Sequence, residues 1–222
     1  MNMSLPLSIL RWLRPGQRDV SANTGLVLGF IASFAFAGES AVSLMAAGMP
    51  ADCAEYASNV TESEGSFGST SPAVNGTRCY GAFQFCDSGT LQSYWSGSTA
   101  DFLASPSAQV AAWQKYENNQ WAQANRLGLT GMVGQQVCYN GTCAIISQSS
   151  ILKACQFGCG KGGKLYNFMQ SGLDCSGPGT KDGAGTSVCS YLISGAGYNV
   201  SCITSSNDGV DCLPAEGETK SE

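Results

Sequence analysis

The chain has 222 residues, of which 43% are hydrophobic and 12% are charged, and its net charge is −5. This hydrophobic content suffices for a packed core, and the acidic balance provides no broad basic surface for nucleic acid. The chain has no histidine, which excludes Ser-His-Asp and Cys-His catalysis and removes the commonest zinc ligand. Because no CxxC pair is present either, we expect neither a metal ion nor another cofactor.

All 11 cysteines lie after residue 50. Such a density is typical of disulfide-bonded proteins in oxidising compartments. The spacing of the cysteines does not define which of them pair. The first disulfide that we predict is Cys138–Cys143, which flanks a four-residue Tyr-Asn-Gly-Thr loop. The odd number leaves at least one cysteine without a partner in the chain.

The N-terminal region has the layout of an export signal. Three arginines before residue 20 precede an apolar run from Gly25 to Ala37, and Ala35-Phe36-Ala37 resembles a signal-peptidase site. Later cleavage sites at 46–48 or 49–51 stay open, as does an uncleaved membrane anchor over residues 25–49. We therefore assign residues 1–51 to a signal peptide or anchor and expect the protein in the periplasm or cell envelope.

From residue 52 onward, apolar residues recur mainly at helical spacing. One helix is predicted to end near Glu62, before a Gly- and Ser-rich loop over residues 65–77. A long helix is predicted to start at Ser105-Pro106 and to stop at Gly128. Shorter helices are predicted after a cap at Asp87 or Ser88, and within residues 145–155, 165–169 and 187–193. The sequence thus predicts a mainly α globule with long loops, stapled by disulfides.

The order of several segments is similar to that of a known superfamily. Glu62-Ser63, a glycine-containing loop, Asn75 and the segment YGAFQF at residues 80–85 resemble the lysozyme-like lytic transglycosylases. Segments at 105–121, 151–163 and 182–191 are similar in the same order. The resemblance implies a lysozyme-like catalytic domain over residues 52–204, followed by a polar tail over 205–222. Two features depart from the superfamily: Glu64 stands where relatives often have glycine, and the interval before Gly81 is longer.

The resemblance also implies how such a site works. A single Glu first donates a proton to the glycosidic oxygen and then acts as base, while the sugar's own hydroxyl closes an anhydro ring. Glu62 is the expected catalytic acid and Glu64 is its rival. These two cannot face one groove within a helix, because residues two apart point to opposite sides. If the reaction is hydrolysis, Asp87 or Asp101 is a candidate second carboxylate. The candidate substrate-binding residues are Ser63, Tyr80, Gln84 and Tyr191.

The expected function is cleavage of the β-1,4 bond between N-acetylmuramic acid and N-acetylglucosamine in peptidoglycan glycan strands. Such an enzyme opens the wall for a membrane-associated secretion or conjugation apparatus, or for a phage. One alternative is a catalytically silent lysozyme-like protein that binds the wall or assists assembly. Another is a secreted, disulfide-rich interaction module in which the Glu62 stretch matches by accident.

Overall fold

The computed structural model describes residues 38–181 and 185–205. Within these ranges the helices are α1 (Ala41–Ala46), α2 (Ala51–Glu64), α3 (Thr90–Tyr94), α4 (Thr99–Ala104), α5 (Pro106–Arg126), the 3-10 helix η2 (Leu129–Met132), α6 (Gln148–Cys155), α7 (Lys164–Gln170), α8 (Val188–Ser194) and α9 (Ser201–Thr204). Two antiparallel hairpins complete the fold, β1 (Cys79–Tyr80) with β2 (Phe85–Cys86) and β3 (Gln136–Tyr139) with β4 (Thr142–Ile145). The predicted mainly α, disulfide-stapled architecture is confirmed.

Helix α5 is the central element of the fold. Its first turn is capped by the Ser105 hydroxyl, which accepts a hydrogen bond from the amide of Ala108, and Pro106 occupies the first turn. It ends before Gly128, whose φ of 71° lies in the left-handed region. Both predicted boundaries of this helix are therefore confirmed.

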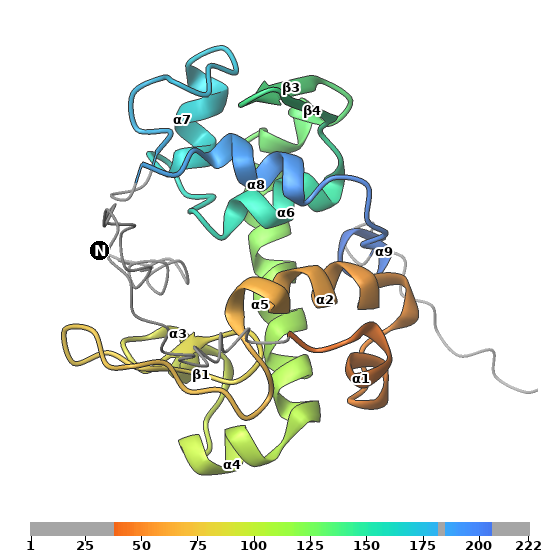
Figure 1. Ribbon diagram of the computed structural model, residues 1–222, viewed down its shortest axis with the longest axis vertical. Helices are drawn as coiled ribbons and strands as arrows, with labels where there is room; N and C mark the ends of the chain where they lie inside the picture. Colours follow the sequence, from red (N-terminus) through yellow and green to blue (C-terminus); the bar gives the residue numbers. More distant parts are fainter. Residues whose placement is uncertain (1–37, 182–184, 206–222) are drawn as a thin grey trace, which may run out of the picture.

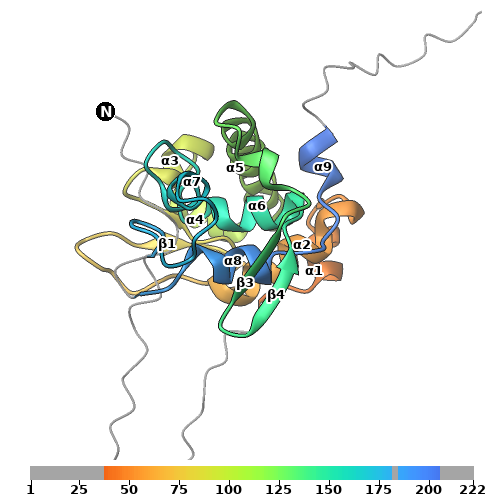
Figure 2. The same ribbon diagram turned by 90° about the horizontal axis from the view of Figure 1, so that it is seen from above.

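The other elements form two groups around α5 (Figure 1). The β1–β2 hairpin, α3 and α4 lie near its N-terminal half, whereas α6, α7, α8 and the β3–β4 hairpin lie near its C-terminal end. Helix α2 crosses α5 between these groups. The view from above places the β3–β4 hairpin beside α8 (Figure 2). The C-terminal end of α2 consequently lies where the two groups meet.

An aromatic core joins α2, α5 and the β1–β2 hairpin. The ring of Trp113 in α5 stacks on Phe83 at a centroid distance of 4.9 Å and contacts Tyr56 of α2 at 5.9 Å. Tyr116 and Trp121 continue the same stripe along α5, and both are buried. These aromatic residues of α5 therefore pack into the core.

The folded unit begins before residue 52, the boundary expected from the sequence. Leu44 of α1 and Met49 are buried in the core. The amide of Glu39 donates to Thr61 Oγ1 at 2.9 Å, and the Glu39 carboxylate accepts from the amide of Phe67 at 2.8 Å. Residues 38–50 thus pack on α2 and its following loop. Helix α1 escaped prediction because its short apolar sequence continues the hydrophobic character of the leader.

Two other expectations need correction. The helix predicted over 145–155 starts only at Gln148, because residues 142–145 form β4 and Ser147 provides a capping box. Asn140 and Gly141 both have positive φ, which suits the tight turn between β3 and β4. Helix α3 is preceded by Gly89 in place of a side-chain cap from Asp87 or Ser88.

Five disulfides staple the described residues: Cys53–Cys202, Cys79–Cys86, Cys138–Cys143, Cys155–Cys159 and Cys175–Cys189. The predicted Cys138–Cys143 pair is confirmed. Cys212, the eleventh cysteine, lies outside the described residues, as does most of the expected tail. This disulfide content is consistent with an exported protein.

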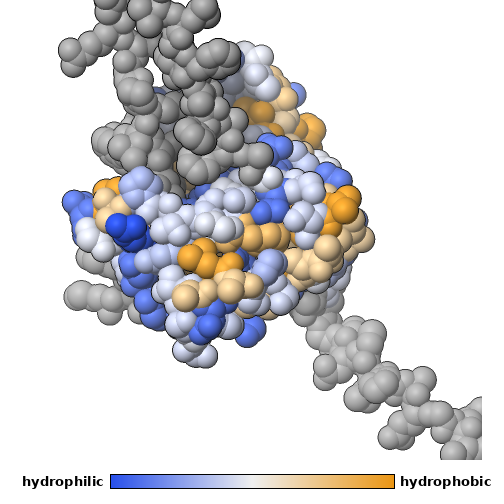
Figure 3. Space-filling model, turned by 60° about the horizontal axis from the view of Figure 1, so that its bottom comes forward, coloured by the Kyte–Doolittle hydropathy of each residue, from blue (hydrophilic) through white to orange (hydrophobic). Residues whose placement is uncertain are grey.

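Neither described range contains a helix long and apolar enough to cross a bilayer. The leader and the proposed anchor up to residue 37 lie outside those ranges. On the face shown in Figure 3, hydrophobic residues form small groups among hydrophilic ones. The large hydrophobic side chains that are exposed in the described ranges are Val42, Met45, Val133 and Ile145.

Candidate functional site

The two candidate acids lie in the last turn of α2. Glu62 is exposed, whereas Glu64, the last helical residue, is half-buried. Because the helix runs through both residues, their side chains leave it in roughly opposite directions. Gly65 then ends α2 with a φ of 149°, a conformation that favours glycine.

The β1–β2 hairpin is held against the loop that follows α2. Gln109 of α5 is fully buried, and its Oε1 accepts from the amide of Ala82 at 2.9 Å while its Nε2 donates to the carbonyls of Phe67 and Phe102. A Cβ atom at Gly81 would lie only 2.2 Å from Gln109 Oε1. Glycine at this position therefore allows the hairpin to approach α5.

Gln84 lies beside the end of α2. It is 2% exposed, has a φ of 50°, and donates through Nε2 to the carbonyl of Gly81 at 2.8 Å. A Cβ atom built on Gly65 would lie 3.4 Å from Gln84 Nε2. Gln84 Oε1 is buried and has no hydrogen-bond partner within the described ranges. The structure thus brings the predicted amide next to the residue that follows Glu64.

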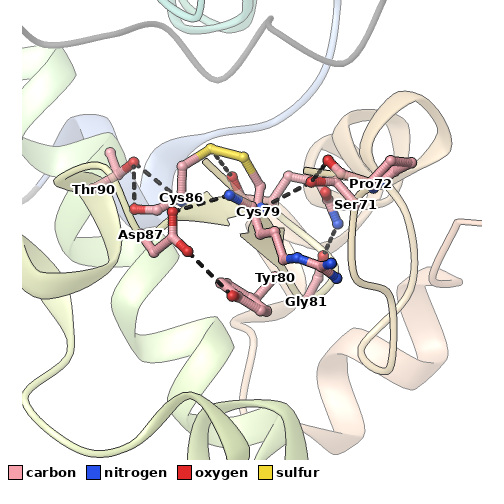
Figure 4. The surroundings of a disulfide bond; sticks show 10 residues. Ser71, Pro72, Cys79, Tyr80, Gly81, Cys86, Asp87 and Thr90 are labelled. Atoms are coloured by element: carbon pink, nitrogen blue, oxygen red, sulfur yellow. Dashed lines mark hydrogen bonds between the residues drawn. A yellow bond between two sulfur atoms is a disulfide. The ribbon is translucent and has the colours of Figure 1, made fainter. Parts of the chain in front are cut away.

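The other predicted substrate-binding residues have local partners. The exposed Ser63 donates its hydroxyl to the carbonyl of Val60 at 2.9 Å, which is ordinary for a serine near a helix end. Tyr80 is half-buried in β1 and donates to Asp87 Oδ2 at 3.2 Å, as seen beside the Cys79–Cys86 disulfide (Figure 4). Tyr191 of α8 packs its ring against Phe157 at a centroid distance of 3.8 Å.

The two candidate second carboxylates both support local structure. Asp87 accepts from the amide of Arg78 at 3.0 Å and from the Tyr80 hydroxyl, so it links the two ends of the hairpin. Asp101 lies in the first turn of α4 and accepts from the Ser98 hydroxyl at 2.6 Å, while its amide donates to the same hydroxyl. Neither residue lies on the helix that carries Glu62 and Glu64.

A buried pair of ionisable residues lies behind the end of α2, and sequence reasoning did not assign it. Lys153 of α6 is 4% exposed and donates to the backbone carbonyl of Asn59 at 2.9 Å and to its Oδ1 at 2.7 Å. Burial lowers the pKa of Lys153 to about 8, while the carboxyl groups of Glu64, Glu62 and Glu117 act in the opposite direction. Lys153 therefore connects α6 electrostatically and by hydrogen bonds to the last two turns of α2.

Glu117 of α5 is the acidic member of this pair. It is fully buried, and neither carboxyl oxygen has a hydrogen-bond partner in the described part of the chain. Burial raises its pKa to about 8, and Lys153 only partly offsets that effect. Burial also raises the pKa values of Tyr56 and Tyr116, and the Glu117 carboxyl raises them further. A signal for this residue existed in the sequence, because Glu117 is four residues after Trp113 on the buried face of α5.

One group of potential metal ligands occurs among the described residues, formed by Asp52, Cys53 and Cys202. The two cysteines are joined in a disulfide, so they provide no thiolates. The Asp52 carboxylate accepts a hydrogen bond from Ser201 of α9. We therefore interpret this group as a link between α2 and α9.

Comparisons of this chain with models of protein families, with curated proteins and with solved structures return no match.

Proposed function

We propose that this protein cleaves peptidoglycan glycan strands at the β-1,4 bond between N-acetylmuramic acid and N-acetylglucosamine. A single carboxyl group at the end of α2 acts as acid and then as base, in the manner of lytic transglycosylases. The observation that carries this proposal is the closeness of Gly65, directly after the two glutamates, to Gln84 on the β1–β2 hairpin, since a Cβ atom built on Gly65 would lie 3.4 Å from Gln84 Nε2. This closeness supports the pairing of acid and amide that the resemblance implies.

Two residues compete for the role of the acid. The resemblance assigns it to Glu62, which is exposed. A general acid benefits from a partly dry environment that keeps its proton near neutral pH, and this argument favours the half-buried Glu64. Both residues lie in the last turn of α2, so either assignment places the reaction at this end of the helix.

The export of the protein is part of the same proposal. Five disulfides connect the described residues, and these bonds persist in the periplasm or on the cell surface, where peptidoglycan is located. A wall-cleaving enzyme placed there serves an envelope-spanning secretion or conjugation apparatus, or a phage. Its partners are then the glycan strands and the membrane-associated machinery that controls where the wall is opened.

The exposure of Glu62 favours one second candidate, a protein that binds the wall without cleaving it. If Glu62 occupies the place of the acid, its exposed carboxyl group lacks the partly dry surroundings that a general acid uses. Such a protein retains the glycan-binding surface and loses turnover. The same experiment separates the two functions.

The test is incubation of the purified, oxidised protein with peptidoglycan sacculi, followed by mass spectrometry of the soluble products. Anhydro products, lighter by one water than their hydrolysed counterparts, support the transglycosylase reaction, and reducing ends indicate hydrolysis. Binding to sacculi without any products supports the second candidate. If the protein neither releases products nor binds sacculi, both proposed functions are contradicted.

The acid is identified with Glu62→Gln and Glu64→Gln, which keep the side-chain shape and remove the titrating proton. The variant that lacks the acid is expected to lose at least about 100-fold in turnover, the usual scale for general acid catalysis. Glu55→Gln is the matched control, because Glu55 is exposed and lies two turns before Glu62 on the same helix. Full activity in both test variants would exclude the end of α2 as the catalytic site.

A further inference from the structure

We propose that Lys153 is a positioning residue for this reaction, with a buried ammonium group that is tied to Asn59 near the end of α2 and supplies the positive charge that acts on Glu64. The inference rests on the proposed function, with Glu64 as the acid. Nothing in the resemblance assigns a role to Lys153. It follows from where the side chain ends and from which charges surround it.

The first argument is the anchoring of the ammonium group. Lys153 Nζ has two acceptors on one residue, the backbone carbonyl and the side-chain oxygen of Asn59. Asn59 lies three residues before Glu62 and five before Glu64, so the ammonium group is tied one turn before the site. A lysine side chain has many rotamers in water, and burial with two acceptors restricts it to one place.

The second argument is the balance of charge around Lys153. Three carboxyl groups act on it, those of Glu64, Glu62 and Glu117, with Glu64 the strongest. Glu117 is fully buried, and its pKa is raised to about 8, so this group is mainly neutral at pH 7. Helices α8 and η2 also pack on α6. The titratable residue of α8 is Tyr191, since Cys189 is disulfide-bonded, and η2 has no titratable residue. At pH 7 the positive charge of Lys153 therefore acts mainly on the carboxyl groups of Glu64 and Glu62 at the end of α2.

The consequence concerns the proton on the acid. A nearby positive charge favours the ionised form of a carboxyl group, so the ammonium group of Lys153 favours the ionised form of Glu64. In the single-Glu reaction the same group must give up a proton and then take one back. A cation held at this place makes the second role, as base, more accessible at neutral pH.

The test compares Lys153→Met with Lys115→Met. Both remove one positive charge, but Lys115 is exposed on α5. In Lys153→Met we expect the basic limb of the kcat profile to move to higher pH by about one unit, because the acid holds its proton longer. Lys115→Met should leave the profile unchanged. A basic limb that stays in place in Lys153→Met would overturn the inference.

A second measurement is independent of activity. Titration of the Glu64 carboxyl carbon by NMR should show a higher pKa in Lys153→Met than in the unmodified protein. If Lys153→Met does not fold, Lys153→Gln removes the charge while keeping a donor for Asn59. An unchanged Glu64 titration contradicts the electrostatic link, whether or not sacculi are cleaved. A shifted titration in a protein that cleaves nothing supports the link and defeats the proposed function alone.

Discussion

At the scale of single residues, Glu117 should make stability depend on pH. Burial raises its folded-state pKa from 4.5 to about 8, so between these values the folded protein binds a proton that the unfolded chain has released. The free energy of unfolding then falls as pH rises from about 4.5 to 8, by at most about 1.4 kcal/mol per pH unit from this group. Denaturant unfolding at pH 5 and pH 8 measures the change.

The isosteric Glu117→Gln variant has no titrating group at this position, so we expect its stability to lose this dependence. At higher pH Lys153 changes the free energy of unfolding in the opposite direction, because its folded-state pKa of about 8 lies below the ordinary 10.5. Its contribution makes stability rise between these two values. Glu55→Gln, a change on the exposed face of α2, should retain the slope of the unmodified protein. The same slope in Glu117→Gln as in the unmodified protein would contradict the assignment.

The sequence predicts the burial of single side chains better than it predicts their hydrogen-bond partners. The burial of Phe83 against Trp113 follows from the hydrophobicity of the two side chains. Lys153 was included in an amphipathic helix without a role, because its partner Asn59 is 94 residues away. No local pattern indicates such a contact. The hydrogen bond that Gln109 accepts from Ala82 of the β1–β2 hairpin, 27 residues away, was hidden for the same reason.

At the scale of elements, disulfides should stabilise the fold according to the length of chain they close. Cys53–Cys202 joins α2 to α9 across 149 residues, whereas Cys138–Cys143 closes a separation of 5 within one hairpin. Chain entropy gives about 5 kcal/mol for the long loop and about 2 kcal/mol for the short one. Replacing both cysteines of a pair by serine and measuring denaturant unfolding tests this order. Equal losses of unfolding free energy in the two double variants would show that linking α9 to α2 adds little to stability.

Elements with strong end signals were predictable and those defined by pairing were not. Helix α5 has a serine cap, a proline in its first turn and a glycine after its end, and both boundaries were correct. Ile145 is the predicted first residue of a helix, but the Asn140-Gly141 turn pairs residues 142–145 with β3. The short helices α1, α4 and α9 have four to six residues each, too few for a helical period to stand out.

At the scale of the whole molecule, residues directly after the predicted leader pack on α2. Residues 38 and 39 already contact α2 and its loop, whereas the apolar run of the leader ends at Ala37. Processing at one of the later sites, within 46–51, would remove α1 and Glu39 from the folded unit. Of the candidate sites, the one after Ala37 is therefore compatible with the structure.

This placement predicts how truncation affects stability. Removing residues 1–37 keeps every described residue, whereas removing residues 1–50 deletes the buried side chains of Leu44 and Met49. Each such side chain contributes about 1.5–3 kcal/mol, so the loss should be about 3–6 kcal/mol. Denaturant unfolding of the two truncated proteins, both oxidised, measures this loss.

The point variant Leu44→Ala is expected to lower the free energy of unfolding by about 2–5 kcal/mol, and Val42→Ala, at a position that is 71% exposed, should lower it much less. Equal stability of the two truncated proteins, or an exported form that starts after residue 44, would place α1 outside the folded unit.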